Sequence, residues 1–371
     1  MSDANPFHDL AVPGVRGLMP YQPGKPVSEL ERELGIRGAV KLASNESPLG
    51  PSPRALEAAD AALPELARYP DGGGYHLKAH LAAHLGVAPE RITLGNGSND
   101  VLELVARTFA GPGDEVVYSR HAFVVYALAA QAVGARGVEV PAREFGHDLE
   151  AMAAAVTPAT RLVFVANPNN PTGTWVGREP LKAFLAGLPE HVIPVVDEAY
   201  FEYVAEPDYP DALQWLERFP RLVVTRTFSK AYGLAGLRVG YGVSHPDLAE
   251  LLNRVRQPFN VNSLALAAAE AALDDLAHLE RGVSLNRREM ARVTAALADR
   301  GVPYIPSVGN FVTVDAGGPA GPVYEALLRE GVIVRPVAGY GLPHHLRVSL
   351  GLEEENDRFL AALDRVQGRA S

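Results

Sequence analysis

Lys230 stands in the segment of the sequence that is best suited to covalent chemistry. Ser229 precedes it, Tyr232 follows, and Arg238 comes a few residues later in a glycine-rich stretch. A lysine amine can form an imine with a carbonyl compound, and serine and arginine side chains can hold a phosphate. Glycine allows the backbone of such a loop to approach a ligand closely. Taken alone, Lys230 could be a solvated lysine of a basic loop, so the prediction depends on the motifs upstream.

Residues 95–100 (Gly-Asn-Gly-Ser-Asn-Asp) predict a seat for an anion. They follow an expected strand and open an expected helix. Backbone N–H groups at a helix N-terminus bind phosphate, and Gly97, Ser98 and Asn99 are the candidates here. The segment is not a dinucleotide fingerprint, because the third glycine and the acidic ribose partner are absent. A plain turn with a serine or asparagine N-cap is the alternative.

Two further segments follow expected strands, at the edge where open α/β sheets bind ligands. Residues 167–173 (Asn-Pro-Asn-Asn-Pro-Thr-Gly) come first, and Asn167 can donate a hydrogen bond to a cofactor oxygen. Asp197 and Tyr200 end the next strand. A carboxylate there can face a protonated ring nitrogen and keep it charged, and Tyr200 can hydrogen-bond a ring oxygen. A structural turn and a helix N-cap are the respective alternatives.

An imine-forming lysine, a phosphate seat and a carboxylate for a ring nitrogen together suggest pyridoxal phosphate as the cofactor. Phe123 could stack on its planar ring, although a lone phenylalanine is more often a core residue. Arg335 and Arg347 lie in or at the end of apolar strands, where an unpaired charge is costly. Each therefore needs an anion, which could be a bound carboxylate or phosphate, or the partner in a buried salt bridge.

The hydrophobic pattern predicts an α/β fold with a mainly parallel, buried central sheet. The expected strands are residues 91–94, 115–118, 137–140, 162–166, 193–196 and 222–225, with helices such as 101–109 and 126–133 between them. After about residue 255, long helical segments precede strands at 311–314 and 346–349, which predicts a smaller α+β domain. We therefore expect an irregular, proline-rich N-terminal arm at 1–40, a large cofactor-binding domain at 41–254 and a small C-terminal domain at 255–371.

Composition excludes several classes of protein. The 371 residues are 47% hydrophobic and 21% charged, as in soluble globular proteins, and no apolar run approaches the roughly 18 residues of a membrane span. The net charge of −10 argues against nucleic acid as a partner. A first segment without a secretory pattern and a cysteine count of 0 predict a cytoplasmic location.

His76, His80 and His84 recur at helical spacing and could ligate a metal from one helix face. Leu77, Leu81 and Leu85 form a parallel stripe that looks like the buried face of the same helix. The histidines would then be partly exposed, and no carboxylate or cysteine completes a set of ligands. No metal site is expected.

The order of these motifs resembles that of the fold-type I pyridoxal-phosphate aminotransferases. The motifs are residues 97–99, 167–173, 197–200 and 229–238. Four more segments are similar to the histidinol-phosphate aminotransferases within that superfamily: 16–21 (Arg-Gly-Leu-Met-Pro-Tyr), 42–50 (Leu-Ala-Ser-Asn-Glu-Ser-Pro-Leu-Gly), 68–71 (Arg-Tyr-Pro-Asp) and 334–336 (Val-Arg-Pro). The resemblance spans nearly the full length of the chain.

The resemblance implies roles for individual residues. Lys230 would bind the cofactor as an imine and move a proton, and Asp197 would pair with the ring nitrogen. Asn167 and Tyr200 would contact the ring hydroxyl oxygen, and Phe123 stands where relatives usually carry a stacking tyrosine. The cofactor phosphate would be held by Gly97, Ser98, Asn99, Ser229 and Arg238.

A second set of implied contacts involves the substrate and a partner subunit. Tyr21, Asn45, Arg335 and Arg347 would surround the substrate. Tyr69 would reach the cofactor phosphate from the neighbouring subunit, so the resemblance implies a homodimer with shared active sites.

The resemblance also implies a reaction, which belongs to histidine biosynthesis. L-Histidinol phosphate would give its amino group to the cofactor and leave as imidazole-acetol phosphate, and 2-oxoglutarate would take the group and leave as glutamate. Arg347 would hold the phosphate in one half and a carboxylate in the other. A broad aromatic amino acid aminotransferase and a decarboxylase of a phosphorylated amino acid are the alternatives on this scaffold. A catalytically idle binding domain is a third, which the presence of Lys230 and Asp197 argues against.

Overall fold

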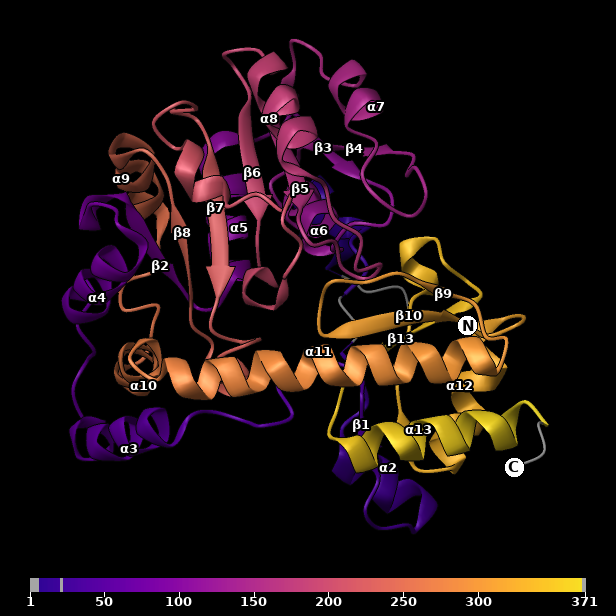
Figure 1. Ribbon diagram of the computed structural model, residues 1–371. Coiled ribbons are helices and arrows are strands. Elements are labelled where there is room, and N and C mark those ends of the chain that lie inside the picture. Colours follow the sequence, from indigo (N-terminus) through magenta and orange to yellow (C-terminus); the bar gives the residue numbers. More distant parts are fainter. Residues whose placement is uncertain (1–6, 21–22, 369–371) are drawn as a thin grey trace.

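A seven-stranded sheet forms the centre of the larger part of the molecule (Figure 1). The computed structural model describes residues 7–20 and 23–368. The strands of this sheet, in spatial order, are β2 (Ile92–Gly95), β8 (Gly240–Val243), β7 (Val223–Thr227), β6 (Ile193–Asp197), β5 (Thr160–Ala166), β3 (Glu115–Ser119) and β4 (Arg136–Val140). The five strands from β7 to β4 are parallel, whereas β8 runs antiparallel to both of its neighbours.

Successive residues of the central strands point to opposite faces of this sheet, and both faces are covered. Val116 packs into a core with α5 and α6, whereas its neighbour Val117 packs into a second core with α7 and α8. The helices of this part are α3 (Pro53–Ala62), α4 (Tyr75–Leu85), α5 (Ser98–Phe109), α6 (Val125–Ala132), α7 (Leu149–Ala154), α8 (Arg178–Gly187), α9 (Pro246–Val255) and α10 (Ser263–Leu273), of which α3 packs on α10. Burial on both faces explains why the strands read as continuous apolar runs.

The C-terminal part is built on a four-stranded antiparallel sheet. Its order is β12 (Arg335–Pro336), β13 (His345–Ser349), β10 (Phe311–Asp315) and β9 (Tyr304–Ile305). Three helices pack with it: α11 (Leu276–Asp299), α12 (Ala320–Arg329) and α13 (Glu353–Val366). The long α11 runs from the neighbourhood of α10 to this sheet and so joins the two parts (Figure 1).

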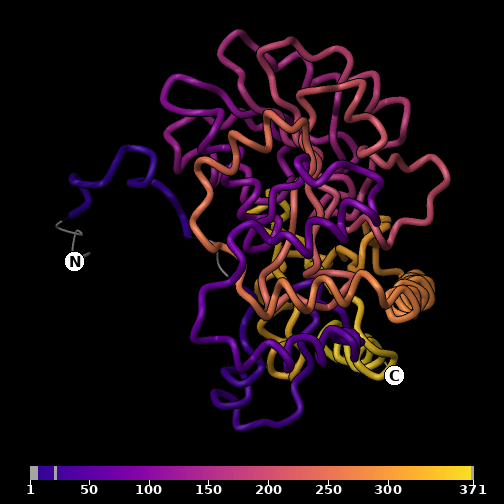
Figure 2. Tube along the Cα trace, turned by 90° about the vertical axis from the view of Figure 1, so that its left-hand side faces the viewer, coloured from indigo at the N-terminus to yellow at the C-terminus, as the bar shows by residue number. Residues whose placement is uncertain are grey.

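Segments near the N-terminus pack with the C-terminal part. Strand β1 (Val40–Lys41) pairs in parallel with β11 (Val332–Ile333), and Leu42 lies in the core that contains β10 and β13. Upstream, α2 (Val27–Leu34) buries Leu30. Residues 7–20, which include α1 (Pro13–Arg16), project from one side of the molecule, with α1 against α6 (Figure 2).

The predicted fold class is confirmed, and every strand expected from the pattern is present within a residue or two. Two of the differences from the prediction have a clear physical reason. Strand β8 (Gly-Tyr-Gly-Val) is rich in glycine, which is normally depleted in strands. The expectation of an irregular arm is wrong at α2, because Pro26 is the N-cap of this helix and does not interrupt it.

The predicted domain boundaries remain a prediction, and the pairing of β1 with β11 favours grouping residues 40–43 with the C-terminal part. No helix in the described ranges has the length and apolar character needed to cross a membrane.

Candidate active site

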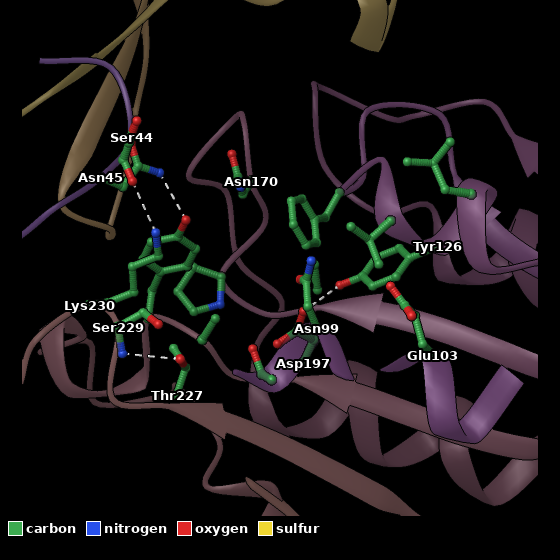
Figure 3. A pocket seen from close by; sticks show the side chains of 18 of the residues that line it. Ser44, Asn45, Asn99, Glu103, Tyr126, Asn170, Asp197, Thr227, Ser229 and Lys230 are labelled. Atoms are coloured by element: carbon green, nitrogen blue, oxygen red, sulfur yellow. Dashed lines mark hydrogen bonds between the residues drawn. The ribbon is translucent and has the colours of Figure 1, made fainter. Parts of the chain in front are cut away.

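A cavity of about 390 Å³ lies where β5, β6 and β7 end, and it gathers most of the predicted site residues (Figure 3). Those that line it are Asn45, Ser98, Asn99, Phe123, Asp197, Tyr200, Ser229, Lys230, Arg238 and Arg347. They come from segments far apart in the sequence and from both parts of the molecule. The cavity at the carboxyl edge of the sheet is therefore lined by side chains that can take part in chemistry, as the positions of the motifs predicted.

Lys230 lies just beyond β7, and its amine donates a hydrogen bond to the backbone oxygen of Ser44 at 3.1 Å. Burial is the main cause that lowers the pKa of this amine, to about 7, and the nearby positive charge of Arg347 adds to the effect. A substantial fraction of the amine is therefore neutral at neutral pH. Only the neutral amine is a nucleophile, so the site activates Lys230 for attack on a carbonyl.

Asp197 ends β6 and is buried beside this lysine pocket. The hydroxyl of Tyr126 donates to its Oδ2 at 2.8 Å, and the hydroxyl of Thr225 donates to its Oδ1 at 3.0 Å. Burial raises the pKa of Asp197, and these two hydrogen bonds act against that rise because they favour the ionised form. The carboxylate is therefore supported as an anion at the cavity wall.

The first turn of α5 and Arg238 together make a seat for an anion. Gly97 precedes the helix with φ of 85°, and a Cβ atom there would lie 2.6 Å from Nη2 of Arg238. Only glycine permits both this backbone angle and this approach. Ser98, Asn99 and Ser229 line the cavity with Arg238. Helix N–H groups, hydroxyls and a guanidinium are the donors that phosphate requires.

Residues 43–45 connect three of the predicted site residues. Arg347 donates to the backbone oxygen of Ala43 at 2.6 Å, and Lys230 donates to that of Ser44. The side chain of Asn45 donates to the hydroxyl of Tyr200 at 2.8 Å. Arg347 also donates to Oδ1 of Asn170 at 2.5 Å, so its guanidinium is oriented by two neutral oxygens.

Several predicted site residues do not line the cavity. The side chain of Asn167 both accepts from and donates to the backbone of Val176, at 2.8 and 3.1 Å. Arg335 is half-buried outside the cavity wall, and Tyr69 is 82% exposed and stacks on Phe259. Their contacts with cofactor or substrate remain predictions. Tyr21 lies outside the described residues.

The histidines at helical spacing are on α4, and His80 lies 3.1 Å from a carboxylate oxygen of Glu270. Among the residues that the structure describes, no group of three or more His, Cys, Asp or Glu side chains could hold a metal ion.

The site also contains polar residues that were not predicted individually, among them Ser44, Tyr126, Asn170 and Thr225. Asn170 stands in the predicted 167–173 loop, and Ser44 in the 42–50 segment, so both had a motif as a signal. Tyr126 and Thr225 had none, because a tyrosine in an apolar helix and a threonine in a buried strand look like ordinary core residues.

Comparison with known proteins identifies the family. Residues 37–363 match the family model described as aminotransferase class I and II. The chain belongs to this family. The match covers both parts of the molecule and every residue that lines the cavity, so the site described above is the site of an aminotransferase fold.

This aminotransferase has close relatives over its full length. It is 61% identical to histidinol-phosphate aminotransferase 1 of Nitrosococcus oceani, with 97% of each chain covered. It is also 61% identical to histidinol-phosphate aminotransferase 2 of Pseudomonas aeruginosa, with 99% of each covered. Among solved structures it is similar to the histidinol-phosphate aminotransferase of Sinorhizobium meliloti in complex with pyridoxal-5'-phosphate, at 34% identity and a TM-score of 0.89, covering 96% of this chain and 97% of that one.

Proposed function

We propose that this aminotransferase moves the amino group of L-histidinol phosphate to 2-oxoglutarate, with pyridoxal phosphate as its cofactor. One observation carries the proposal: an activated amine, a carboxylate and a guanidinium, those of Lys230, Asp197 and Arg347, line a single cavity. The names and the full-length identity of the relatives support the choice of substrate.

The residues of the cavity fit pyridoxal phosphate. When bound, this cofactor supplies an aldehyde that takes up an amino group and a ring that withdraws electrons from the substrate's Cα. Lys230 would hold the aldehyde carbon, Asp197 would face the ring nitrogen, and Phe123 would lie against the ring. The seat formed by Gly97, Ser98, Asn99, Ser229 and Arg238 would hold the phosphate.

Lys230 also has the properties of a general base. With a pKa of about 7, its amine can take a proton from the substrate's Cα at neutral pH and donate it back later in the amino-group transfer. The amine donates to the backbone oxygen of Ser44, and Arg347 donates to the backbone oxygen of the adjacent Ala43. Residues 43–45 therefore hold both the base, Lys230, and the arginine that would bind the anion, Arg347.

Arg347 would hold the anionic end of both substrates. A planar guanidinium binds carboxylate and phosphate alike, and a ping-pong reaction requires one pocket for both. Because hydrogen bonds to Asn170 and Ala43 already orient the Arg347 side chain, this side chain loses little conformational entropy when an anion binds. Arg335 on β12 pairs in register with Arg347 on β13, which places a second guanidinium on the neighbouring strand.

The proposal includes a homodimer in which Tyr69 of one subunit completes the site of the other. The side chain of Tyr69 is exposed in the single chain, as are Phe7, Leu10, Val12, Met19, Leu56, Leu63 and Leu66. This amount of exposed apolar surface favours a partner of the same kind. If the sites are shared, mixing Lys230→Ala chains with Tyr69→Phe chains would restore part of the activity that each lacks, because one site in each mixed dimer is intact. A cytoplasmic location remains a prediction from the sequence.

The test is the ratio of kcat/KM for histidinol phosphate to kcat/KM for phenylalanine and tyrosine, each with 2-oxoglutarate. A ratio of several hundredfold would support the proposal, because discrimination is a difference in transition-state binding. A ratio near one would instead identify a broad aromatic amino acid aminotransferase.

A further inference from the structure

Asn45 is buried, and hydrogen bonds within the protein engage its side chain and backbone. Its side-chain Nδ2 donates to the hydroxyl of Tyr200 at 2.8 Å, and its Oδ1 accepts from the hydroxyl of Ser349 at 2.9 Å. Its backbone N–H donates to the same serine oxygen at 2.7 Å, and its backbone oxygen accepts from Asn310 at 3.0 Å. The residue has φ of 55°, a conformation that asparagine tolerates better than most residues.

These hydrogen bonds have a direction. Ser349 accepts the backbone N–H of Asn45, so its single hydroxyl proton is available for Oδ1 of Asn45. This contact sets which end of the amide faces Tyr200, and that end is the NH₂ group, which can only donate. The Tyr200 oxygen must therefore accept, and its own proton points elsewhere.

We propose that Asn45, oriented by Ser349, is a positioning residue that directs the Tyr200 hydroxyl proton into the cavity. Tyr200 lines the cavity beside Lys230, whose amine lies 5.7 Å from the centre of the Tyr200 ring. With the cofactor bound, a hydroxyl aimed this way would donate to its anionic ring oxygen. The inference rests on the proposed cofactor, and it revises the expectation that Asn45 touches the substrate.

The arrangement also ties the cofactor site to the substrate site. Ser349 and Arg347 are two positions apart on β13, so both side chains lie on the same face of that strand. The strand that carries the anion clamp therefore also fixes the direction of the hydrogen bond to Tyr200. A shift of β13 would change both together.

The experiment is Asn45→Asp, which keeps the shape and replaces the donor by an acceptor. Tyr200 would then donate to the new carboxylate and turn a lone pair toward the ring oxygen. We expect the pH midpoint of the absorbance change of the purified, cofactor-loaded protein to rise by about one unit, because the anionic ring oxygen loses its donor. We also expect the dissociation constant for pyridoxal phosphate to rise by roughly tenfold. Ser349→Ala, which releases the amide and also removes the acceptor of the Asn45 backbone N–H, should shift both quantities less and in the same direction.

A double-mutant cycle separates hydrogen-bond direction from added charge. In a Tyr200→Phe background no hydroxyl remains to be turned, so Asn45→Asp should add less than half of its original shift. Asn286→Asp, at an amide that donates to the backbone of Gly309 outside the cavity, controls for a carboxylate added elsewhere. Equal shifts in both backgrounds, or no shift in either, would overturn the inference. None of these readouts needs a substrate, so they stand even if the histidinol phosphate assignment fails.

Discussion

Asp197 and Glu198 are adjacent at the end of β6, and both are buried, but their surroundings differ. The hydrogen bonds of Asp197 come from the neutral hydroxyls of Tyr126 and Thr225, and its carboxylate lines the cavity. Glu198 points to the other face, where Arg226 contacts it through Nε and Nη2 at 2.9 and 2.7 Å. The carboxylate of Asp197 therefore faces the cavity, whereas that of Glu198 is paired with an arginine inside the protein.

The environment of Glu198 is a closed network. Arg226 also donates to Asp211 at 2.7 Å and lies 3.5 Å from the ring centre of Phe201, and the backbone of Ala212 donates to Glu198. Removing one member of such a network strands a buried charge. Burial alone therefore does not mark a functional carboxylate. The two residues differ in whether the protein itself supplies a positive charge to pair with the carboxylate.

The greatest loss of activity is expected for a change at Lys230 in the cavity. Lys230→Ala should lower turnover on the order of ten-thousandfold or more and remove the absorbance of the lysine-bound cofactor, because among the described residues no other amine lines the cavity. The folded structure should persist. Steady-state kinetics and absorbance spectra check this, with Lys182→Ala on α8 as the control that keeps activity. Retained turnover in Lys230→Ala would contradict the assignment.

The second prediction sets the adjacent carboxylates against each other. Asp197→Asn should lower kcat on the order of a hundredfold with little loss of stability, because it removes the negative charge that would pair with the ligand. Glu198→Gln should lower the free energy of unfolding by about 3 kcal/mol at pH 8, because it breaks a buried ion pair. Kinetics and denaturant unfolding of both variants are the measurements. If both variants lose mainly stability, the distinction between the two carboxylates is wrong.

The third prediction concerns the two arginines on paired strands. Arg347 lines the cavity and Arg335 does not, so Arg347→Ala should lower kcat/KM for histidinol phosphate and for 2-oxoglutarate by about a hundredfold. Arg335→Ala should cost about tenfold, and mainly with the phosphorylated substrate. An equal loss for histidinol phosphate and phenylalanine in Arg335→Ala would remove this residue from the phosphate site.

The last prediction concerns the dependence of stability on pH in the cofactor-free protein. The pKa of Lys230 is about 7 in the fold, below its value of about 10.4 in an unfolded chain, so between these pH values the unfolded state binds more protons. The stability contributed by this group therefore rises with pH across that window. Lys230→Met removes the cost of burying this amine, so the free energy of unfolding of the variant should exceed that of the wild type most near pH 7. The difference between the two free energies should decrease by up to about 1.4 kcal/mol per pH unit toward pH 10. A constant gap in denaturant unfolding would contradict the perturbed lysine.

Particular elements show how far sequence reasoning reached. The strands β3, β5, β6 and β7 were predictable because a strand buried on both faces reads as a short apolar run, and the residues at their ends were predictable because such ends meet at one edge. Strand β8 was missed because its two glycines hide the pattern, and α2 because Pro26 at its N-cap resembles a break. The contact of Asn167 with the cofactor stays a prediction, and the structure adds that the backbone of Val176 orients this side chain.

Residue types and their order along the chain were enough to predict the kind of chemistry, because the lysine, the expected phosphate seat, the carboxylate and the two arginines each belong to a local motif. The partners that orient these groups became known only from the fold. Ser349 orients Asn45 across 304 positions of sequence, and Tyr126 supports Asp197 across 71. The physical reason is that side-chain hydrogen bonds depend on distance and direction in space, which the fold sets and which no local pattern of residues records.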